Sequence, residues 1–263
     1  MSARLSTLQA RLPHGPLDVA RQVSLFVAAY LVYRLTRGLV NHPEAATAAF
    51  QNARELIGIE RALNIFIEPS LQALVAGQGW LLDAAAWLYI NGQSSITVGA
   101  LAWLYLCRNG SFYFVRNTFL VAFAIALVGY SLFPTAPPRF FPEWGFFDAV
   151  SDFTGVPQDS VTIGKLFNPY AAVPSMHVGF ALMISVPLVK LVRRRALKVC
   201  WALYPVIMVF VIVVTANHFI ADAVLGAVAA GIGALVAMGL ARLRPGAWSF
   251  QPSSGSQVAP AGV

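Results

Sequence analysis

The sequence contains few charged residues. Asp, Glu, Lys and Arg make up 11% of its 263 residues, whereas soluble domains carry about 25%, so the composition argues against a soluble domain. Hydrophobic residues make up 58%, and the mean hydropathy is +0.67. The composition therefore indicates an integral membrane protein. In such a protein we interpret the net charge of +7 as orienting the chain in the bilayer, not as a nucleic-acid surface.

Cysteine is scarce as well. Cys107 and Cys200 are the only two in the chain. Two lone cysteines form no disulfide framework and lack the spacing of a metal site. Each lies near one end of an apolar segment, and we expect both to be free thiols.

Long apolar segments are abundant. A transmembrane helix needs about 20 apolar residues, and six segments approach or exceed that length, so we expect an all-α, six-helix membrane bundle. The first segment runs past signal-peptide length without a clear cleavage site and is interpreted as an uncleaved span. The segments are residues 20–40, 80–106, 114–133, 175–192, 199–216 and 219–241. They form one predicted catalytic domain, residues 1–244, followed by a disordered tail, 245–263, rich in Pro, Gly and Ser.

Lys and Arg predict the orientation. With six spans, the four basic regions fall on one side, and the positive-inside rule makes that side cytoplasmic. Both termini and both cysteines would then be cytoplasmic, where thiols stay reduced. We expect a multi-pass protein of the plasma membrane. The basic residues are Arg4, Arg11 and Arg21; Arg108 and Arg116; Arg193, Arg194, Arg195 and Lys198; and Arg242 and Arg244.

The two long connections, 41–79 and 134–174, would face outward. In the first, "GIERALNIFIEPSLQALV" predicts one amphipathic helix on the outer membrane surface. A helix packed over the mouth of the bundle is the alternative, and the sequence leaves it open. The apolar face would hold Leu63, Phe66, Ile67, Leu71 and Leu74, and other faces Glu60, Arg61, Asn64 and Glu68.

The last span carries a stripe of small residues. Gly226, Ala230, Gly233 and Ala237 recur at spacings of three and four, which lets helix backbones approach closely. We expect this stripe to pack within the molecule and not between two copies.

Ionisable residues in spans are costly and are candidates for function, and here they gather toward the outer ends. His218 and Asp222 are spaced i, i+4, which places both on one helix face. A carboxylate bonded to one imidazole nitrogen fixes the tautomer and leaves the other nitrogen as a nucleophile or base. His177 begins the fourth span. Arg139 follows the third, and Arg34 and Arg37 lie toward the outer end of the first.

Two helix starts add to this polar group. Asn217 and Ser175 are placed to cap the sixth and fourth spans, and helix N-termini attract anions. Phosphate is the anion we favour. A metal bound by two His and one Asp is a weaker alternative. We assign Arg116 to the cytoplasmic end, and His14 and His42 to solvated loops.

The motifs "PTAPPR", "NPYAAVPSMH" and "NHFIAD" resemble those of the type-2 phosphatidic-acid-phosphatase superfamily, and more closely its branch of inositol-phosphorylceramide synthases and bacterial relatives. The resemblance covers most of the chain. It implies that His218 is the nucleophile that forms a phosphohistidine, with Asp222 orienting it. It further implies that His177 is the general acid, and that Arg139 and Ser175 bind phosphate without a metal or other cofactor.

The sequence differs from the superfamily pattern at four positions. Met176 replaces a Gly, Leu132 a Lys, and Val211 and Ile212 a Ser-Arg pair. Two cationic phosphate ligands of the pattern are therefore absent. Candidates to replace them, or to line the pocket, are Lys165, Arg34, Arg37, Asn168, Tyr170, Asn91 and Gln93.

We thus expect an integral-membrane lipid phosphatase or inositolphosphotransferase-like phosphotransferase, acting on a lipid phosphate or phospholipid near the outer face. Water as acceptor gives a phosphatase, and a hydroxyl gives a transferase. A non-enzymatic lipid-binding or lipid-translocating protein is the alternative. A metal-dependent hydrolase is a third, which excess chelator would inhibit.

Overall fold

The computed structural model describes residues 12–40, 43–157 and 169–243, with the backbone alone at 33–40 and 43–45. Within those residues the fold is helical, without strands; a single bridge joins Thr135 and Ala171. The helices are α2 (Gly15–Val40), α3 (Pro43–Ala62), α4 (Glu68–Val75), α5 (Gly79–Trp87), a π-helical turn (Leu88–Gly92), α6 (Gln93–Cys107), α7 (Asn109–Leu132), α8 (Ala149–Thr154), α10 (Met176–Leu191), α11 (Arg195–Val214) and α12 (Ile220–Leu243). Two 3₁₀ turns, Pro138–Phe140 and Pro142–Trp144, lie between α7 and α8.

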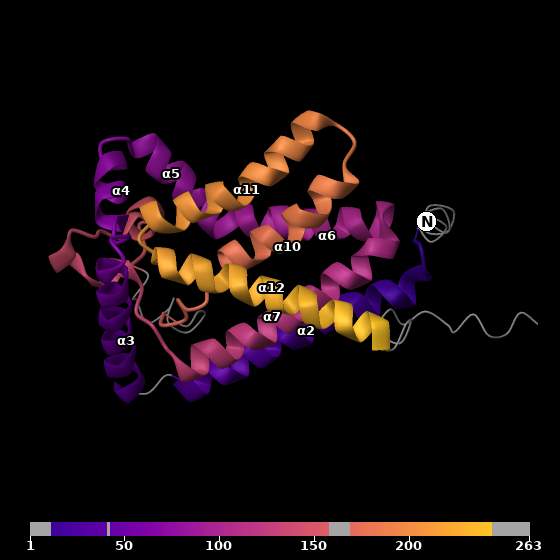
Figure 1. The fold of residues 1–263 in the computed structure, drawn as a ribbon, viewed down its shortest axis with the longest axis horizontal. Helices are drawn as coiled ribbons and strands as arrows, with labels where there is room; N and C mark the ends of the chain where they lie inside the picture. The colour runs from indigo at the N-terminus through magenta and orange to yellow at the C-terminus, as the bar shows by residue number, and fades with distance from the viewer. Residues whose placement is uncertain (1–11, 41–42, 158–168, 244–263) are drawn as a thin grey trace, which may run out of the picture.

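The long helices lie side by side, and α3 and α4 stand across one end of them (Figure 1). The π-helical turn joins α5 to α6, so residues 79–107 form one helical segment where the sequence predicts the second span. The remaining five predicted spans correspond to α2, α7, α10, α11 and α12, with boundaries shifted by up to five residues.

Among the residues that the structure describes, three helices are able by length and composition to cross a membrane: α7, α11 and α12. A fourth span is possible if the pair formed by α4 and residues 79–107, bent by 119°, counts as one. Helix α10 is apolar but has only 16 residues. These apolar helices indicate a multi-pass membrane protein, and the count of six spans stays a prediction.

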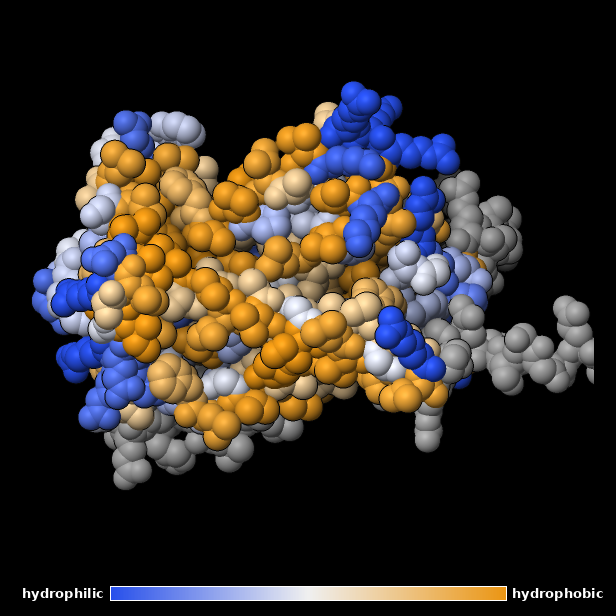
Figure 2. Space-filling view, viewed as in Figure 1, coloured by the Kyte–Doolittle hydropathy of each residue, from blue (hydrophilic) through white to orange (hydrophobic). Residues whose placement is uncertain are grey.

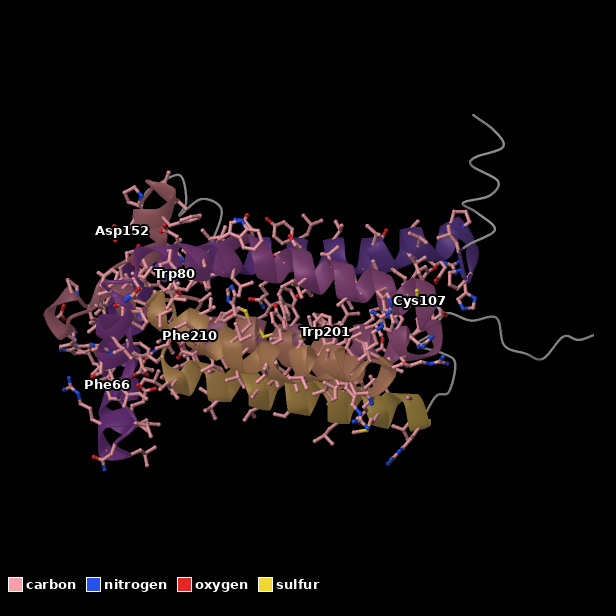
Figure 3. All side chains as sticks on the ribbon, turned by 90° about the horizontal axis from the view of Figure 1, so that it is seen from above. Phe66, Trp80, Cys107, Asp152, Trp201 and Phe210 are labelled. Carbon is pink, nitrogen blue, oxygen red and sulfur yellow. The ribbon has the colours of Figure 1, made fainter. Side chains whose placement is uncertain are left out.

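On the face that Figure 2 shows, the surface is apolar along the bundle and polar toward both ends. The connections α6–α7 and α10–α11 and the end of α12 all lie at the end opposite to α3 (Figure 1). Arg193, Arg194 and Arg195 are exposed there. Figure 3 places Cys107 at this same end, and Phe66 and Asp152 at the end covered by α3. The basic connections therefore share one end, as the sequence predicts, with the described cysteines exposed and free.

The prediction of one amphipathic helix in "GIERALNIFIEPSLQALV" is wrong. The segment forms the end of α3 and all of α4, which are separated by a turn in which Asn64 has a φ of +57°. Leu63 and Leu74, assigned to the apolar face, are 62% and 77% exposed. Glu60 and Glu68, assigned to the other faces, are fully buried. These two carboxylates are buried because they accept hydrogen bonds from the start of α12 across the bundle end, in line with the alternative of a helix over its mouth.

The small-residue stripe of α12 packs inside the molecule. Gly226, Ala230, Gly233 and Ala237 are all buried. A Cβ on Gly233 would lie 2.9 Å from the carbonyl oxygen of Thr118 in α7, and a Cβ on Gly226 would overlap the carbonyl oxygen of Ser175. The stripe thus brings α12 against α7 and against the start of α10.

A buried polar network ties α2 to α6 and α7. Oδ2 of Asp18 accepts hydrogen bonds from the hydroxyls of Tyr105 and Tyr113, each at 2.8 Å, and Oδ1 accepts one from Gln22. Arg116 donates to Oε1 of Gln22 at 2.6 Å. Arg116 lies near the start of α7, the helix end that the sequence assigns to the cytoplasm, and there it is buried and joins α7 to α2. His14, exposed as expected, lies beside this network and is bonded to Asn109.

Candidate active site

His218 lies in the turn that joins α11 to α12. The chain can reverse here because Ala216 adopts a φ of +53° and the N–H groups of Asn217 and His218 both bond the carbonyl of Ile212. His218 is only 4% exposed. Its Nδ1 lies 3.2 Å from Oδ2 of Asp222. When Nδ1 carries the proton, Nε2 keeps its lone pair and can act as a nucleophile.

His177 occupies the first turn of α10 and faces His218. The centroids of the two imidazole rings are 5.6 Å apart, and the ring planes are inclined by 57°. Gln93 of α6 donates a hydrogen bond of 2.8 Å to the carbonyl oxygen of His177. Gln93, predicted as a possible lining residue, thus forms a hydrogen bond between α6 and α10. Asn91 is exposed.

Tyr89 is a site residue that the sequence does not reveal. Its ring stacks on His177 with centroids 4.2 Å apart and planes inclined by 15°, and it lies 6.5 Å from His218. Tyr89 reaches this position from the π-helical turn Leu88–Gly92. Such turns inside α-helices recur at functional sites, but the spacing of apolar residues does not predict them.

Replacing Tyr89 by leucine is expected to lower kcat by up to about tenfold, because an aromatic pair contributes about 0.5–1.5 kcal/mol beyond its buried area. The Tyr89→Phe variant keeps the ring and should retain most of the rate. Steady-state kinetics of both variants, with kcat measured across pH, checks this. Equal loss in both variants would contradict a role for stacking.

Arg139 is held against the turn that carries His218. Its backbone N–H donates to the carbonyl of Ala216 at 2.9 Å, and its Nη1 donates to Oδ1 of Asn217 at 2.6 Å. Nε lies 3.9 Å from Oδ2 of Asp148. The guanidinium also lies over the ring of Phe140, 5.0 Å from its centroid. These contacts hold the positive charge of Arg139 against Asn217, the residue that precedes the nucleophile candidate His218.

Ser175 occupies the N-cap position of α10, but its hydroxyl makes no capping bond within the described structure. The hydroxyl is buried, and none of the described residues bonds it. The backbone N–H of Ser175 donates to the carbonyl of Asp222 at 3.0 Å, which joins the starts of α10 and α12. The first N–H groups of an α-helix lack intrahelical partners, so the start of α10 is suited to an anion.

The backbone N–H groups at the start of α12 are already bonded to carboxylates of the protein. Three consecutive N–H groups donate to carboxylates: Phe219 to Asp222 at 3.0 Å, Ile220 to Glu68 at 2.9 Å, and Ala221 to Glu60 at 2.7 Å. Asn217 does not cap this helix; its amide bonds Arg139 and the carbonyl of Thr215. The expectation that both helix starts hold the anion is therefore wrong for α12.

The other predicted ligands are only partly placed. Tyr170 packs among Phe50 and Phe140, with ring centroids 6.4 and 6.2 Å away. Lys165, Asn168 and His42, the side chains of Arg34 and Arg37, and the tail 245–263 lie outside the described residues. In the described ranges, no three His, Cys, Asp or Glu side chains are grouped to hold a metal.

The fold and the site define a helical membrane protein that presents two facing histidines, a carboxylate and an arginine at one end of its bundle. The family model of the PAP2 superfamily matches residues 54–236. This match covers well over half of the chain, so the protein belongs to the PAP2 superfamily, and membership supports a lipid-phosphatase type of function. Searches of curated proteins and of solved structures found no match.

Proposed function

We propose that the protein is a membrane lipid phosphatase or phosphotransferase that works through a phosphohistidine on His218. The observation that carries this proposal is the pairing of His218 with Asp222, opposite His177 at 5.6 Å. One histidine is oriented by a carboxylate, and none of the described carboxylates is bonded to the other. Different environments for two similar groups are how acid and nucleophile roles are divided in active sites.

In the first step, Nε2 of His218 attacks phosphorus and forms a P–N bond while the ester P–O bond breaks. His177 gives its proton to the leaving oxygen. Arg139, the hydroxyl of Ser175 and the first N–H groups of α10 bind the phosphate oxygens. Their positive potential stabilises the charge that spreads over these oxygens in the transition state.

In the second step, His177 takes a proton from the acceptor, whose oxygen attacks phosphorus. The P–N bond breaks and its electron pair returns to His218. Water as acceptor releases phosphate, whereas a lipid or sugar hydroxyl receives the phosphoryl or headgroup phosphate. The motifs favour the inositolphosphotransferase-like branch, with a polar-headgroup phospholipid as substrate.

The basic connections suggest where the reaction occurs. They lie at the end opposite to the site (Figure 1), and by the positive-inside rule that end is cytoplasmic. We infer an active site toward the outer face of the plasma membrane, with both termini in the cytoplasm. Lys165, Asn168, Tyr170 and Arg37 complete the substrate site in this proposal.

The experiment is turnover by the purified protein in detergent, with a panel of lipid phosphates and phospholipids, with and without hydroxyl acceptors. Release of phosphate, or of a phosphate-bearing headgroup, supports the enzyme. Binding of these lipids without turnover would favour the lipid-binding alternative. Inhibition by excess chelator would favour a metal-dependent hydrolase instead.

The Arg139→Gln variant is expected to lose about 10²-fold or more in kcat/KM, the usual effect of removing one donor to a developing oxyanion. Arg54→Gln is the matched control, because Arg54 is an exposed residue of α3 at the same end. Kinetics with one lipid phosphate compares the two. A similar effect in both variants would contradict a specific phosphate contact by Arg139.

A further inference from the structure

Two glutamates from outside the predicted spans hold the start of α12. Glu60, at the end of α3, accepts a hydrogen bond from the N–H of Ala221 at its Oε1. Glu68, the first residue of α4, accepts one from the N–H of Ile220 at its Oε1. Because Ile220 and Ala221 are consecutive, the two carboxyl groups are held next to each other. Both side chains are fully buried.

Each glutamate has a second oxygen that the described residues leave unbonded. Oε2 of Glu60 and Oε2 of Glu68 are buried without a hydrogen-bond partner among them. A buried polar atom without a partner costs about 1–3 kcal/mol, and more if it is charged. Two such atoms on adjacent carboxyl groups are unfavourable together unless something joins them.

Charge leads to the same conclusion. With Asp222 on the N–H of Phe219, three carboxyl groups share one helix start. A helix N-terminus offers the equivalent of about half a positive charge. Three buried negative charges are not balanced by that amount, and like charges in one site raise the pKa of one group. At least one of the three is expected to hold a proton.

We propose that Glu60 and Glu68 share one proton between their Oε2 atoms, and that the pair positions His218 by holding the first turn of α12. The proton gives both unbonded oxygens a partner and removes one negative charge. Oε1 of each residue remains an acceptor for its backbone N–H. The positioning role rests on the proposed function, whereas the shared proton does not.

The positioning acts through a short path. The pair fixes the N–H groups of Ile220 and Ala221, and the same turn carries Asp222, whose Oδ2 meets His218. On the other side of the turn, Gln72 of α4 donates to the carbonyl of Val214, the last residue of α11, at 3.0 Å. Helices α3 and α4 thus hold both helix ends that flank His218.

The electrostatic surroundings of Glu60 agree with a proton on this pair. Burial first, and then the charges of Glu68 and Asp222, raise the pKa of Glu60 to about 8, although the hydrogen bond from the N–H of Ala221 acts in the opposite direction. Glu68 of α4 and Asp222 of α12 are the charged groups that act on it. His218 lies behind Asp222, and the nearby Arg139 is paired with Asp148.

The sign of the pH effect follows from linkage. Between about 4.5, the ordinary value, and about 8, the folded protein holds a proton on Glu60 that the unfolded chain has released. Stability therefore falls as pH rises through this window and levels off above it. A variant without an ionisable group at residue 60 should lack this slope.

Amide substitutions test the shared proton because they fix the hydrogen-bond directions. In Glu60→Gln, the amide N–H₂ can donate to Glu68 while its oxygen still accepts from Ala221, and Glu68→Gln is the mirror case. In the double variant two N–H₂ groups would face each other, and neither can accept. We expect each single variant to keep activity within about threefold, and the double variant and Glu60→Ala to lose about 10²-fold, the effect of a small misplacement at a reacting centre.

Two measurements do not need turnover. Thermal unfolding in detergent should show the falling stability between about pH 4.5 and 8 in the wild type and not in Glu60→Gln. Infrared spectroscopy with labelled glutamate should show a protonated carboxyl group that titrates near 8 and is lost in both single variants. Glu55→Gln is the control, since Glu55 is an exposed residue of α3.

The outcomes separate the two claims. Single amide variants as unstable as Glu60→Ala, or a double variant as stable as the wild type, would overturn the shared proton, as would the lack of a protonated glutamate. If the stability and infrared results hold but activity in the double variant matches the wild type, the positioning role is overturned. If the wild-type protein shows no turnover, the proposed function is refuted. The shared proton is then tested by thermal unfolding and infrared spectroscopy alone.

Discussion

Replacing His218 by alanine is expected to abolish turnover, with a loss of at least about 10⁴-fold in kcat, the scale seen when a catalytic nucleophile is removed. In the proposed mechanism Nε2 of His218 supplies the bond to phosphorus, and none of the described carboxylates is bonded to the nearby His177 as Asp222 is to His218. The measurement is phosphate or headgroup release from the best lipid substrate, with enzyme in excess so that slow turnover remains visible.

The control for this variant is His14→Ala. His14 is exposed and bonded to Asn109, beside the network at the other end of the bundle, so its loss should leave kcat within about twofold, as for surface substitutions. Lipid-phosphate binding by the His218→Ala variant should persist, because Arg139 and the start of α10 are unchanged. Turnover near the wild-type rate in His218→Ala would remove His218 from the mechanism.

Replacing Gly226 by alanine is expected to disrupt both stability and activity. A Cβ at this position would overlap the carbonyl oxygen of Ser175, which is backbone and cannot rotate away. The helices α10 and α12 must then separate at Ser175, which begins the proposed phosphate site. Overpacking of this kind costs about 1–3 kcal/mol, and more where the backbone must shift. We expect a lower unfolding temperature and at least about 10²-fold lower kcat, the scale for a misplaced site.

The same helix offers a matched control. Gly231 has open space where a Cβ would be added, and alanine is favoured over glycine in a helix interior by about 1 kcal/mol. Gly231→Ala should therefore unfold at the same or a higher temperature, with unchanged kcat. Thermal unfolding of both variants in detergent compares them directly. An unaltered unfolding temperature in Gly226→Ala would contradict the close contact between α12 and Ser175.

The helical class and the catalytic candidates could be predicted from the sequence because their signals are local. Apolar length marks helices such as α7, and the i, i+4 spacing of His218 and Asp222 places them within 3.2 Å of each other. The small-residue stripe likewise predicts close packing of α12. In each case a single segment contains all the information needed.

What could not be predicted depends on contacts between distant segments. Glu60 accepts a hydrogen bond from the N–H of Ala221, which lies 161 residues away in the sequence. Nothing in its own segment distinguishes Glu60 from a solvated acid. The helical pattern around it therefore did not indicate that its carboxyl group is buried. Tyr89 was missed for a related reason, since a π-helical turn shifts the side-chain register without a sequence signal.

The helix starts show a third kind of error. Asn217 and Ser175 have the residue types that favour N-caps, yet neither side chain caps its helix within the described structure. Asn217 bonds Arg139 instead, and carboxylates from α3, α4 and Asp222 take the N–H groups of α12. Capping preferences describe isolated helix ends, and here tertiary partners compete successfully for the same groups.

The most direct test of the central claim is to trap the covalent intermediate. The purified protein is mixed with a lipid substrate carrying labelled phosphate, quenched in base within one turnover, and digested, and the labelled peptide is sequenced. We predict base-stable, acid-labile label on the peptide that contains His218, and none in His218→Ala. Turnover by the wild type with label on another residue, or with none at any time, would contradict it.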